Sequence, residues 1–114
     1  MTNATLTDRL GNIYNLIVMV RENGPELLIG RNFGNHIPTP ADHKRVSQVH
    51  AKLFYTPYFG FALQNNSDSG VGIDGERADG SKFYLKKGEV LILRNGDKFA
   101  LSDSDSFTYM EKSA

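Results

Sequence analysis

The feature that most constrains the fold is an alternation of short apolar runs with clusters of turn-forming residues along almost the whole chain. The runs are rich in aromatic and β-branched residues, and several alternate apolar with polar positions, as in a half-buried strand. Asn-Gly, Asp-Gly and Pro-containing turns separate them. The strands expected on this basis cover residues 14–20, 26–29, 51–55, 58–64, 71–73, 82–85, 90–93, 98–101 and 107–110.

No segment of useful length has a helical period, so the chain is predicted to be all-β. Many short strands with frequent turns are typical of a two-sheet β-sandwich or of a barrel. The alternation alone does not separate a sandwich from an oligonucleotide-binding barrel. Two hairpins are expected, one between residues 14–20 and 26–29 and one between residues 82–85 and 90–93.

The length of 114 residues indicates a single domain with its own core. Residues 1–11 are polar and without a sustained period, so we expect a flexible leader there, a folded domain over residues 12–110 and a tail over residues 111–114. A loop is predicted over residues 31–44, and a loop of that length usually binds something or is mobile.

The chain has 13 Lys and Arg and 13 Asp and Glu residues, so its formal net charge is zero. A neutral molecule has no overall attraction to nucleic acid or acidic lipid, and neither is expected as a partner. The longest apolar run, residues 16–20, is far too short to cross a membrane. Cysteine is absent, which excludes disulfides and cysteine-ligated zinc. We expect an intracellular domain, nuclear or cytoplasmic, within a longer protein.

The sequence contains no Gly-x-Ser-x-Gly elbow, no P-loop and no His-Glu-x-x-His motif, so neither enzymatic activity nor a cofactor is expected. His36, His43 and His50 lie close together, with Asp42 beside them. A metal site is one interpretation, because neutral imidazole is a common ligand. Their spacing fits no metal-binding pattern, and we favour solvated or hydrogen-bonded histidines.

A local cluster of basic residues is more informative about function than the histidines. Between Gly30 and Lys52 the chain has four Lys or Arg residues, against the single acid Asp42. A phosphorylated side chain carries nearly two negative charges and requires fixed donors, ideally an arginine fork with hydroxyl and backbone N–H groups. Arg31 and Ser47 lie near predicted loop ends and offer such donors.

Short motifs in a fixed order carry a resemblance to a known family. They are Gly30-Arg31, then Val46-Ser47-Gln48-Val49-His50, then Ser-Asp-Ser-Gly-Val-Gly-Ile-Asp-Gly at residues 67–75, and finally Leu-Arg-Asn-Gly-Asp-Lys-Phe-Ala-Leu at residues 93–101. In this order they resemble the forkhead-associated (FHA) domain over residues 13–110. The resemblance implies a two-sheet β-sandwich whose loops at one end bind phosphothreonine-containing peptides or proteins.

The resemblance also implies roles for individual residues. Arg31 and Ser47 match the pair that contacts the phosphate, and Gln48 matches a residue that helps to hold the phosphate or the peptide backbone. Arg45 matches a position from which some members select an acidic side chain three residues after the phosphothreonine. Asp68 aligns with a residue, often Ser or Thr, that lines the phosphate and threonine-methyl region. The residues implied to support the site structurally are Gly30, His50 and Gly70.

The sequence departs from the family at two positions of the site. Ser69 stands where an asparagine usually bonds the ligand's main chain, and losing one such hydrogen bond costs about 0.5–1.5 kcal/mol. An acid at Asp68 is unfavourable near a phosphate unless it faces solvent or pairs with a Lys or Arg. We therefore expect phosphopeptide binding, in a weakened or altered form.

Residues 87–93 are similar to those of FHA domains attached to checkpoint-type Ser/Thr protein kinases, which implies a signalling role such as the DNA damage response. One alternative is a phospho-independent interaction or dimerisation domain of the same fold, which would use Tyr55, Tyr58 or Phe83 on a sheet face. Another is a single-stranded nucleic-acid binder on a barrel. In addition, phosphorylation of Thr5 in the leader, three residues before Asp8, would allow phosphorylation-dependent self-association.

Overall fold

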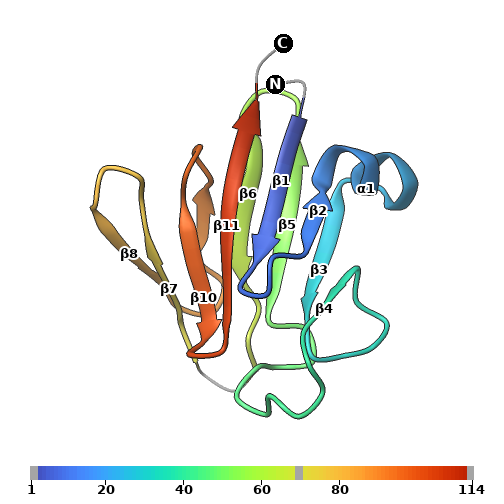
Figure 1. Cartoon of the computed structure of the whole chain (residues 1–114), viewed down its shortest axis with the longest axis vertical. Coiled ribbons are helices and arrows are strands. Elements are labelled where there is room, and N and C mark those ends of the chain that lie inside the picture. The colour runs from blue at the N-terminus through green and yellow to red at the C-terminus, as the bar shows by residue number, and fades with distance from the viewer. Residues whose placement is uncertain (1–2, 69–70, 113–114) are drawn as a thin grey trace.

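The computed structural model describes residues 3–68 and 71–112, which form two β-sheets and one short helix (Figure 1). The strands of the first sheet are β1 (Asn3–Asp8), β2 (Ile13–Asn15), β7 (Ile73–Glu76), β8 (Lys82–Leu85), β10 (Lys98–Ser102) and β11 (Asp105–Lys112). Those of the second sheet are β3 (Glu26–Gly30), β4 (Ile37–Pro38), β5 (Ala51–Thr56), β6 (Gly60–Asn65) and β9 (Val90–Ile92). The spatial orders are β2-β1-β11-β10-β7-β8 and β4-β3-β5-β6-β9.

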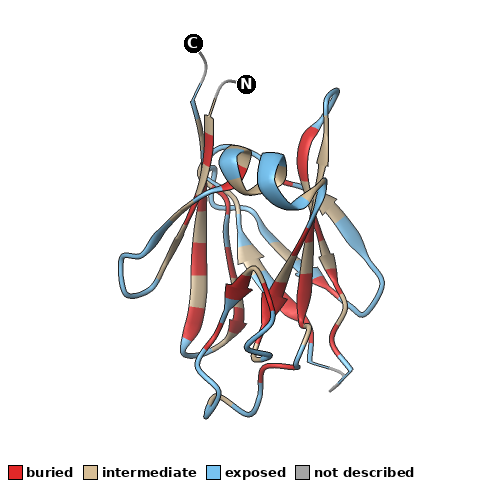
Figure 2. Ribbon diagram, turned by 90° about the vertical axis from the view of Figure 1, so that its right-hand side faces the viewer, coloured by how far each residue is buried: buried red, intermediate tan, exposed pale blue. Residues whose placement is uncertain are grey.

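The core lies between the two sheets, where the buried residues of Figure 2 line the inner faces of the strands. Phe61 and Leu63 of β6 are fully buried, and Tyr109 of β11 meets Phe61 at a centroid distance of 6.1 Å. Side chains alternate between the two faces of a strand, so every second residue of the predicted strands points into this layer. The prediction of an all-β, two-sheet sandwich is confirmed, and the barrel is excluded because the strands belong to two separate sheets.

The predicted flexible leader over residues 1–11 is wrong for the residues that the structure describes. Residues 3–8 form β1, a central strand that pairs with β11 on one side and with β2 on the other. Ala4 and Leu6 alternate with polar neighbours and are buried in the core, which ties down the N-terminal segment. The predicted start of the C-terminal tail at residue 111 is also wrong, because β11 continues to Lys112, opposite Asn3.

The position of Thr5 removes the basis of the self-association hypothesis. Thr5 lies in the middle of β1, with Met110 opposite it on β11 and Asn15 opposite it on β2. A residue held between two partner strands is not available to enter the site of a second molecule without unfolding of the sheet.

The strand predicted over residues 14–20 is wrong, because most of it forms the helix α1 (Leu16–Asn23). The side chain of Asn15 caps the first turn by accepting the N–H of Val18, and Gly24 ends the helix at a φ of 92° with its N–H bonded to Val20 O. β-branched residues lower helix propensity by only a few tenths of a kcal/mol each, which capping and burial of Leu16 outweigh. The hairpin expected here is replaced by pairing of β3 with β5.

Three further strand predictions need correction. The strand expected over residues 71–73 is instead β7, which begins at Ile73 and continues to Glu76. β8 pairs with β7 and β9 pairs with β6, so residues 86–89 connect the two sheets and do not close a hairpin. The N–H of Gly88 donates to Asn65 O, which fixes this crossing against the end of β6. β6 begins only at Gly60, because the N–H of Phe59 bonds Thr56 Oγ1 in the preceding turn, and Phe59 is 66% exposed.

Candidate functional site

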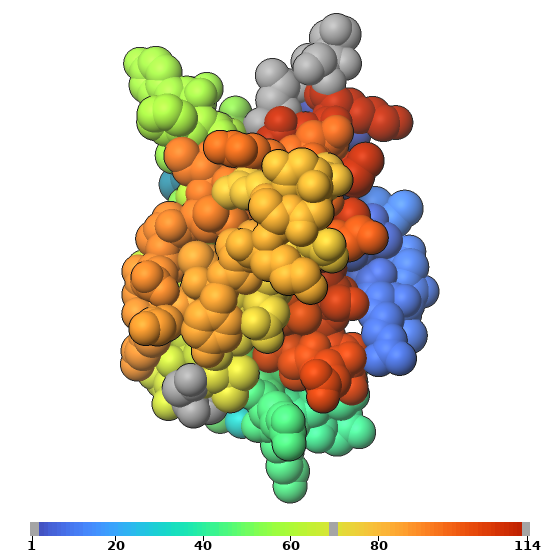
Figure 3. Space-filling model, turned by 90° about the vertical axis from the view of Figure 1, so that its left-hand side faces the viewer, coloured from blue at the N-terminus to red at the C-terminus, as the bar shows by residue number. Residues whose placement is uncertain are grey.

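Three loops meet at the end of the sandwich opposite the start of β1 and the end of β11 (Figure 1). They follow β3, precede β5 and follow β6, and backbone hydrogen bonds join them. The N–H of Arg31 donates to Ser47 O (3.0 Å), and the N–H of Asn66 donates to His50 O (2.8 Å). Segments distant in sequence therefore form one surface, from which the teal residues of the long loop project at the lower end of Figure 3.

Gly30 allows the first two loops to approach. A Cβ atom at this position would lie 2.4 Å from Gln48 O and 2.8 Å from Ser47 O, both backbone atoms. Only glycine fits so close to a neighbouring main chain. The carbonyl of Gly30 also accepts the N–H of Thr39, so that the same residue positions the returning part of the loop.

The structure brings Arg31 and Ser47 together. Arg31 is half-buried, and its Nε donates to Val46 O at 3.0 Å, which fixes the direction of the guanidinium group. Ser47 is 8% exposed, with its Oγ 3.0 Å from Ser67 Oγ and accepting the N–H of Asp68 at 3.2 Å. A guanidinium and a hydroxyl are thus held by the protein itself before any ligand arrives, an arrangement suited to an anion.

His50 supports the backbone of Ser47 from the core. It is fully buried, and its Nδ1 accepts the N–H of Ser47 at 3.0 Å, so Nδ1 carries no proton. The N–H of His50 donates to Ile29 O, which links the segment to β3. Burial lowers the pKa of His50 below its usual value of 6.5, and the charge of Asp105 partly opposes this shift.

This environment predicts a pH dependence of stability. Because the pKa of His50 is lower in the folded protein than in the unfolded chain, the unfolded chain binds more protons between the two values. The contribution of His50 to the free energy of unfolding should therefore fall as the pH drops through about 6.5 towards the folded value, and remain constant above about 6.5. Imidazole NMR signals across this range should show His50 neutral below the pH at which an ordinary histidine titrates. A His50 signal that titrates at or above its usual pKa would contradict the assignment of Nδ1 as an acceptor.

The remaining predicted residues lie around this centre. The side chain of Gln48 is exposed, while its carbonyl accepts the N–H of Asn32 and Asn35 Nδ2. Arg45 is exposed and lines a pocket of about 430 Å³ together with Val71 and Asp103. Predicted residues Ser69 and Gly70 lie outside the described residues.

Asp68 meets both conditions under which an acid is tolerated here. Its side chain is 86% exposed, and its Oδ1 lies 2.9 Å from Lys87 Nζ. Lys87 was not among the residues expected from the sequence. It belongs to the turn that connects β8 and β9, and no local pattern places that turn beside residues 66–68.

Sequence reasoning also missed the polar side chains that shape the loop after β6. Asn65 is fully buried, donates from Nδ2 to Val71 O and Leu85 O, and accepts the N–H of Ser67 on Oδ1. Asn66 Nδ2 donates to Val49 O. The density of Asn, Ser, Asp and Gly in this loop indicated such side-chain-to-backbone bonding, but it did not show which residue bonds which backbone group.

The three histidines have separate partners. His36 Nδ1 accepts the N–H of Leu28 at 2.9 Å, and His43 Nδ1 lies 2.8 Å from Asp105 Oδ2. Residues 3–68 and 71–112 contain no group of three or more His, Cys, Asp or Glu that could hold a metal ion. Within these same ranges no helix has the length and apolar character needed to span a bilayer.

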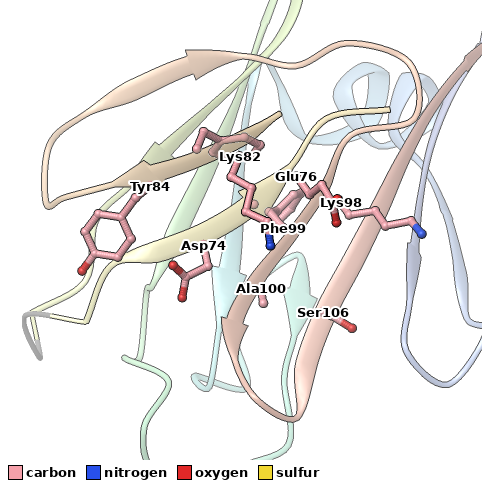
Figure 4. A pocket seen from close by; sticks show the side chains of 10 residues that line it. Asp74, Glu76, Lys82, Tyr84, Lys98, Phe99, Ala100 and Ser106 are labelled. Carbon is pink, nitrogen blue, oxygen red and sulfur yellow. The ribbon is translucent and has the colours of Figure 1, made fainter. Parts of the chain in front are cut away.

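A second hollow, of about 530 Å³, lies on the outer face of the first sheet over β7, β8 and β10 (Figure 4). Charges alternate across its strands, since Glu76 faces Lys82 on one side and Lys98 on the other. Of the aromatic residues predicted for an exposed sheet face, Tyr58 is 91% exposed, whereas Tyr55 and Phe83 pack against the core.

The comparisons with known proteins agree with this geometry. The FHA domain family matches residues 27–102. The chain resembles the FHA domain of human APLF in complex with an XRCC1 bisphospho peptide, with 23% identity, 96% and 99% of the two chains covered and a TM-score of 0.72. The N-terminal FHA domain of Rad53p from Saccharomyces cerevisiae, in complex with a phosphothreonine peptide, gives 17% identity, 96% and 94% coverage and a TM-score of 0.73.

A bacterial domain has the same fold. The FHA domain of the CT664 protein from Chlamydia trachomatis gives 17% identity, 98% and 100% coverage and a TM-score of 0.72. A comparison with curated protein sequences finds no match. At these identities the structural likeness shows the fold, and the match to the family covers most of the chain. On both grounds, the chain belongs to the FHA domain family.

Proposed function

We propose that this domain binds phosphothreonine-containing peptides or proteins at the surface formed by Arg31, Ser47 and the loop that contains Asp68. The observation that carries the proposal is that Arg31, whose guanidinium is anchored on Val46 O, is joined through its backbone N–H to Ser47, whose buried hydroxyl is held by Ser67 and by the N–H of Asp68. Charge-assisted bonds from donors that need no reordering are the strongest that such a site can offer to a phosphate. Two proteins of the same fold were solved with a bisphospho peptide and a phosphothreonine peptide.

The binding experiment compares one degenerate peptide library in three versions, with phosphothreonine, phosphoserine or unmodified threonine at the fixed position. Retention of only the phosphothreonine version is the expected result. Enrichment of an acidic residue three positions downstream would test the proposed role of Arg45. Equal retention of the three versions would contradict phosphopeptide recognition and favour phospho-independent binding, for which the hollow over β7, β8 and β10 is the alternative surface.

The ion pair between Asp68 and Lys87 predicts that removing one partner weakens phosphopeptide binding and removing the other strengthens it. Lys87→Ala should weaken phosphopeptide binding about two- to fivefold, because the charge of Asp68 then faces the phosphate without compensation. Asp68→Ser should strengthen binding by a similar factor, and the double variant should lie between the two. Calorimetric titration of one phosphopeptide at low salt measures all three. Equal affinities throughout would show that this pair lies too far from the phosphate to matter.

We further propose that the domain belongs to a signalling protein such as a protein kinase, and that it acts without catalysis of its own. Because a phosphothreonine reader needs a protein kinase to make its ligand, the proposal includes a location inside the cell, in the nucleus or the cytoplasm. The Rad53 1-466 chain, solved in complex with AMP-PNP, has the same fold over 30% of its length, so a similar domain lies there within a longer polypeptide. The similarity of residues 87–93 to FHA domains attached to checkpoint-type kinases supports a role in signalling such as the DNA damage response.

A further inference from the structure

The loop after β3 contains an unusual apolar side chain. Phe33 is 97% exposed, the highest value among the exposed large hydrophobic residues of the described part of the chain. A single exposed apolar residue is common on protein surfaces and says nothing by itself. The exposure of Phe33 becomes informative because of where the residue lies in the fold.

Phe33 lies at the tip of a turn that the protein holds in place. The N–H of Asn35 donates to Asn32 O, and the N–H of Gly34 donates to Asn32 Oδ1, each at 3.0 Å. Both ends of the turn are then bound to one acceptor, Gln48 O, by the N–H of Asn32 at 3.1 Å and by Asn35 Nδ2 at 2.6 Å. The aromatic side chain is therefore presented by an anchored turn.

The same hydrogen bonds place the turn beside the phosphate-binding pair. Phe33 follows Arg31 by two residues, so their Cα atoms are at most about 7 Å apart. An extended peptide advances about 3.3 Å per residue, so side chains within three residues of the phosphothreonine can reach this distance. Residues 32–35 carry no charge, so an apolar side chain would meet no unpaired charge there.

We propose that Phe33 is a specificity-determining residue, which packs against an aromatic or large aliphatic side chain of the ligand within three residues of its phosphothreonine. The proposal rests on the proposed function and adds a sequence preference to it. Both apolar side chains are exposed to water before binding. Their contact removes this apolar area from water, which favours the complex. An aromatic side chain has only two rotatable bonds and so loses little freedom on binding, which helps such residues to dominate binding energies.

The test uses phosphothreonine peptides with three randomised positions on each side of the phosphothreonine, and three proteins: wild type, Phe33→Ala and Tyr58→Ala. Tyr58 is a matched control, because it is a 91% exposed aromatic residue in the turn between β5 and β6, at the opposite end of the sandwich. Wild type and Tyr58→Ala should both enrich large apolar residues at one or more randomised positions. Phe33→Ala should lose this enrichment and bind the best peptide about five- to thirtyfold more weakly, while it still requires the phosphate.

Each contrary result has a separate meaning. If Phe33→Ala keeps the selection and affinity of wild type, the inference is wrong and phosphothreonine binding stands. If wild type itself does not distinguish phosphorylated from plain peptides, both the proposed function and the inference fail. A dimer of the wild type in sedimentation that Phe33→Ala abolishes would assign the side chain to self-association and overturn the inference. Phe33→Leu, which keeps an apolar side chain on the same turn, should retain most of the enrichment.

Discussion

Arg31→Ala should weaken binding of a phosphothreonine peptide at least about a hundredfold, which corresponds to the loss of charge-assisted hydrogen bonds of about 1.5–3 kcal/mol each. The guanidinium is anchored through Nε on Val46 O, so the wild-type protein loses little freedom when it meets the phosphate. Removal of the side chain takes away both the charge and this pre-arranged geometry. Isothermal titration calorimetry with one phosphopeptide measures the effect directly.

The control is Arg21→Ala, which removes an exposed arginine from the last turn of α1 and should leave affinity unchanged. Circular dichroism and thermal unfolding must show that Arg31→Ala is still folded, because the bond to Val46 O also contributes to the loop. A folded Arg31→Ala protein that binds within threefold of wild type would contradict the proposed site. Ser47→Ala is less suitable as the primary test, since its hydroxyl also bonds Ser67 and the N–H of Asp68.

Gly30→Ala should lower the free energy of unfolding by about 1–3 kcal/mol, the usual cost of overpacking in a tight site. A Cβ at Gly30 would lie 2.4 Å from Gln48 O, and the obstructing atom is backbone and cannot rotate away. The chain would have to separate, which would break the bonds from Arg31 N–H to Ser47 O and from Asn32 N–H to Gln48 O. We therefore expect lost phosphopeptide binding together with lost stability, measured by urea denaturation and by titration.

Gly34→Ala is the matched control for this experiment. Gly34 lies in the same loop, but the nearest atom to its added Cβ is Asn32 Oδ1 at 3.6 Å, an ordinary contact. Stability should then change by no more than about 0.5 kcal/mol, as at most surface positions. If Gly30→Ala were as stable as Gly34→Ala, the close approach of the two loops would not exist in solution.

Alternation and turn chemistry predicted most strands well. β3, β5, β8, β10 and β11 lie where short runs of alternating or β-branched residues lie in the sequence, because a half-buried strand imposes a period of two. The failures have physical reasons. β1 has only Ala4 and Leu6 as apolar inward residues, too few for a periodic signal, and it is stabilised by pairing with β11, about a hundred residues later.

In the segment that forms α1, local signals for a strand compete with local signals for a helix, and composition alone does not decide between them. Residues 16–20 read as a strand because of their β-branched side chains, whereas Asn15 and Gly24 provide the caps of a helix. In the folded protein β3 pairs with β4 and β5, so residues 16–20 have no strand partner there and bury Leu16 as a helix. Tertiary pairing decided between two locally acceptable conformations.

For the site, the sequence by itself determined the residue types and their order: Gly30 and Arg31 after one strand, then Ser47 and His50 before another. These are local properties, since each residue acts through its own chemistry and a short spacing. Only the tertiary structure decided that Lys87 pairs with Asp68, that Asn65 ties its loop to β8, and that the turn carrying Phe33 is anchored to Gln48 O. Such contacts depend on which strands become neighbours in two sheets, and strand pairing between distant segments leaves no local trace in the sequence.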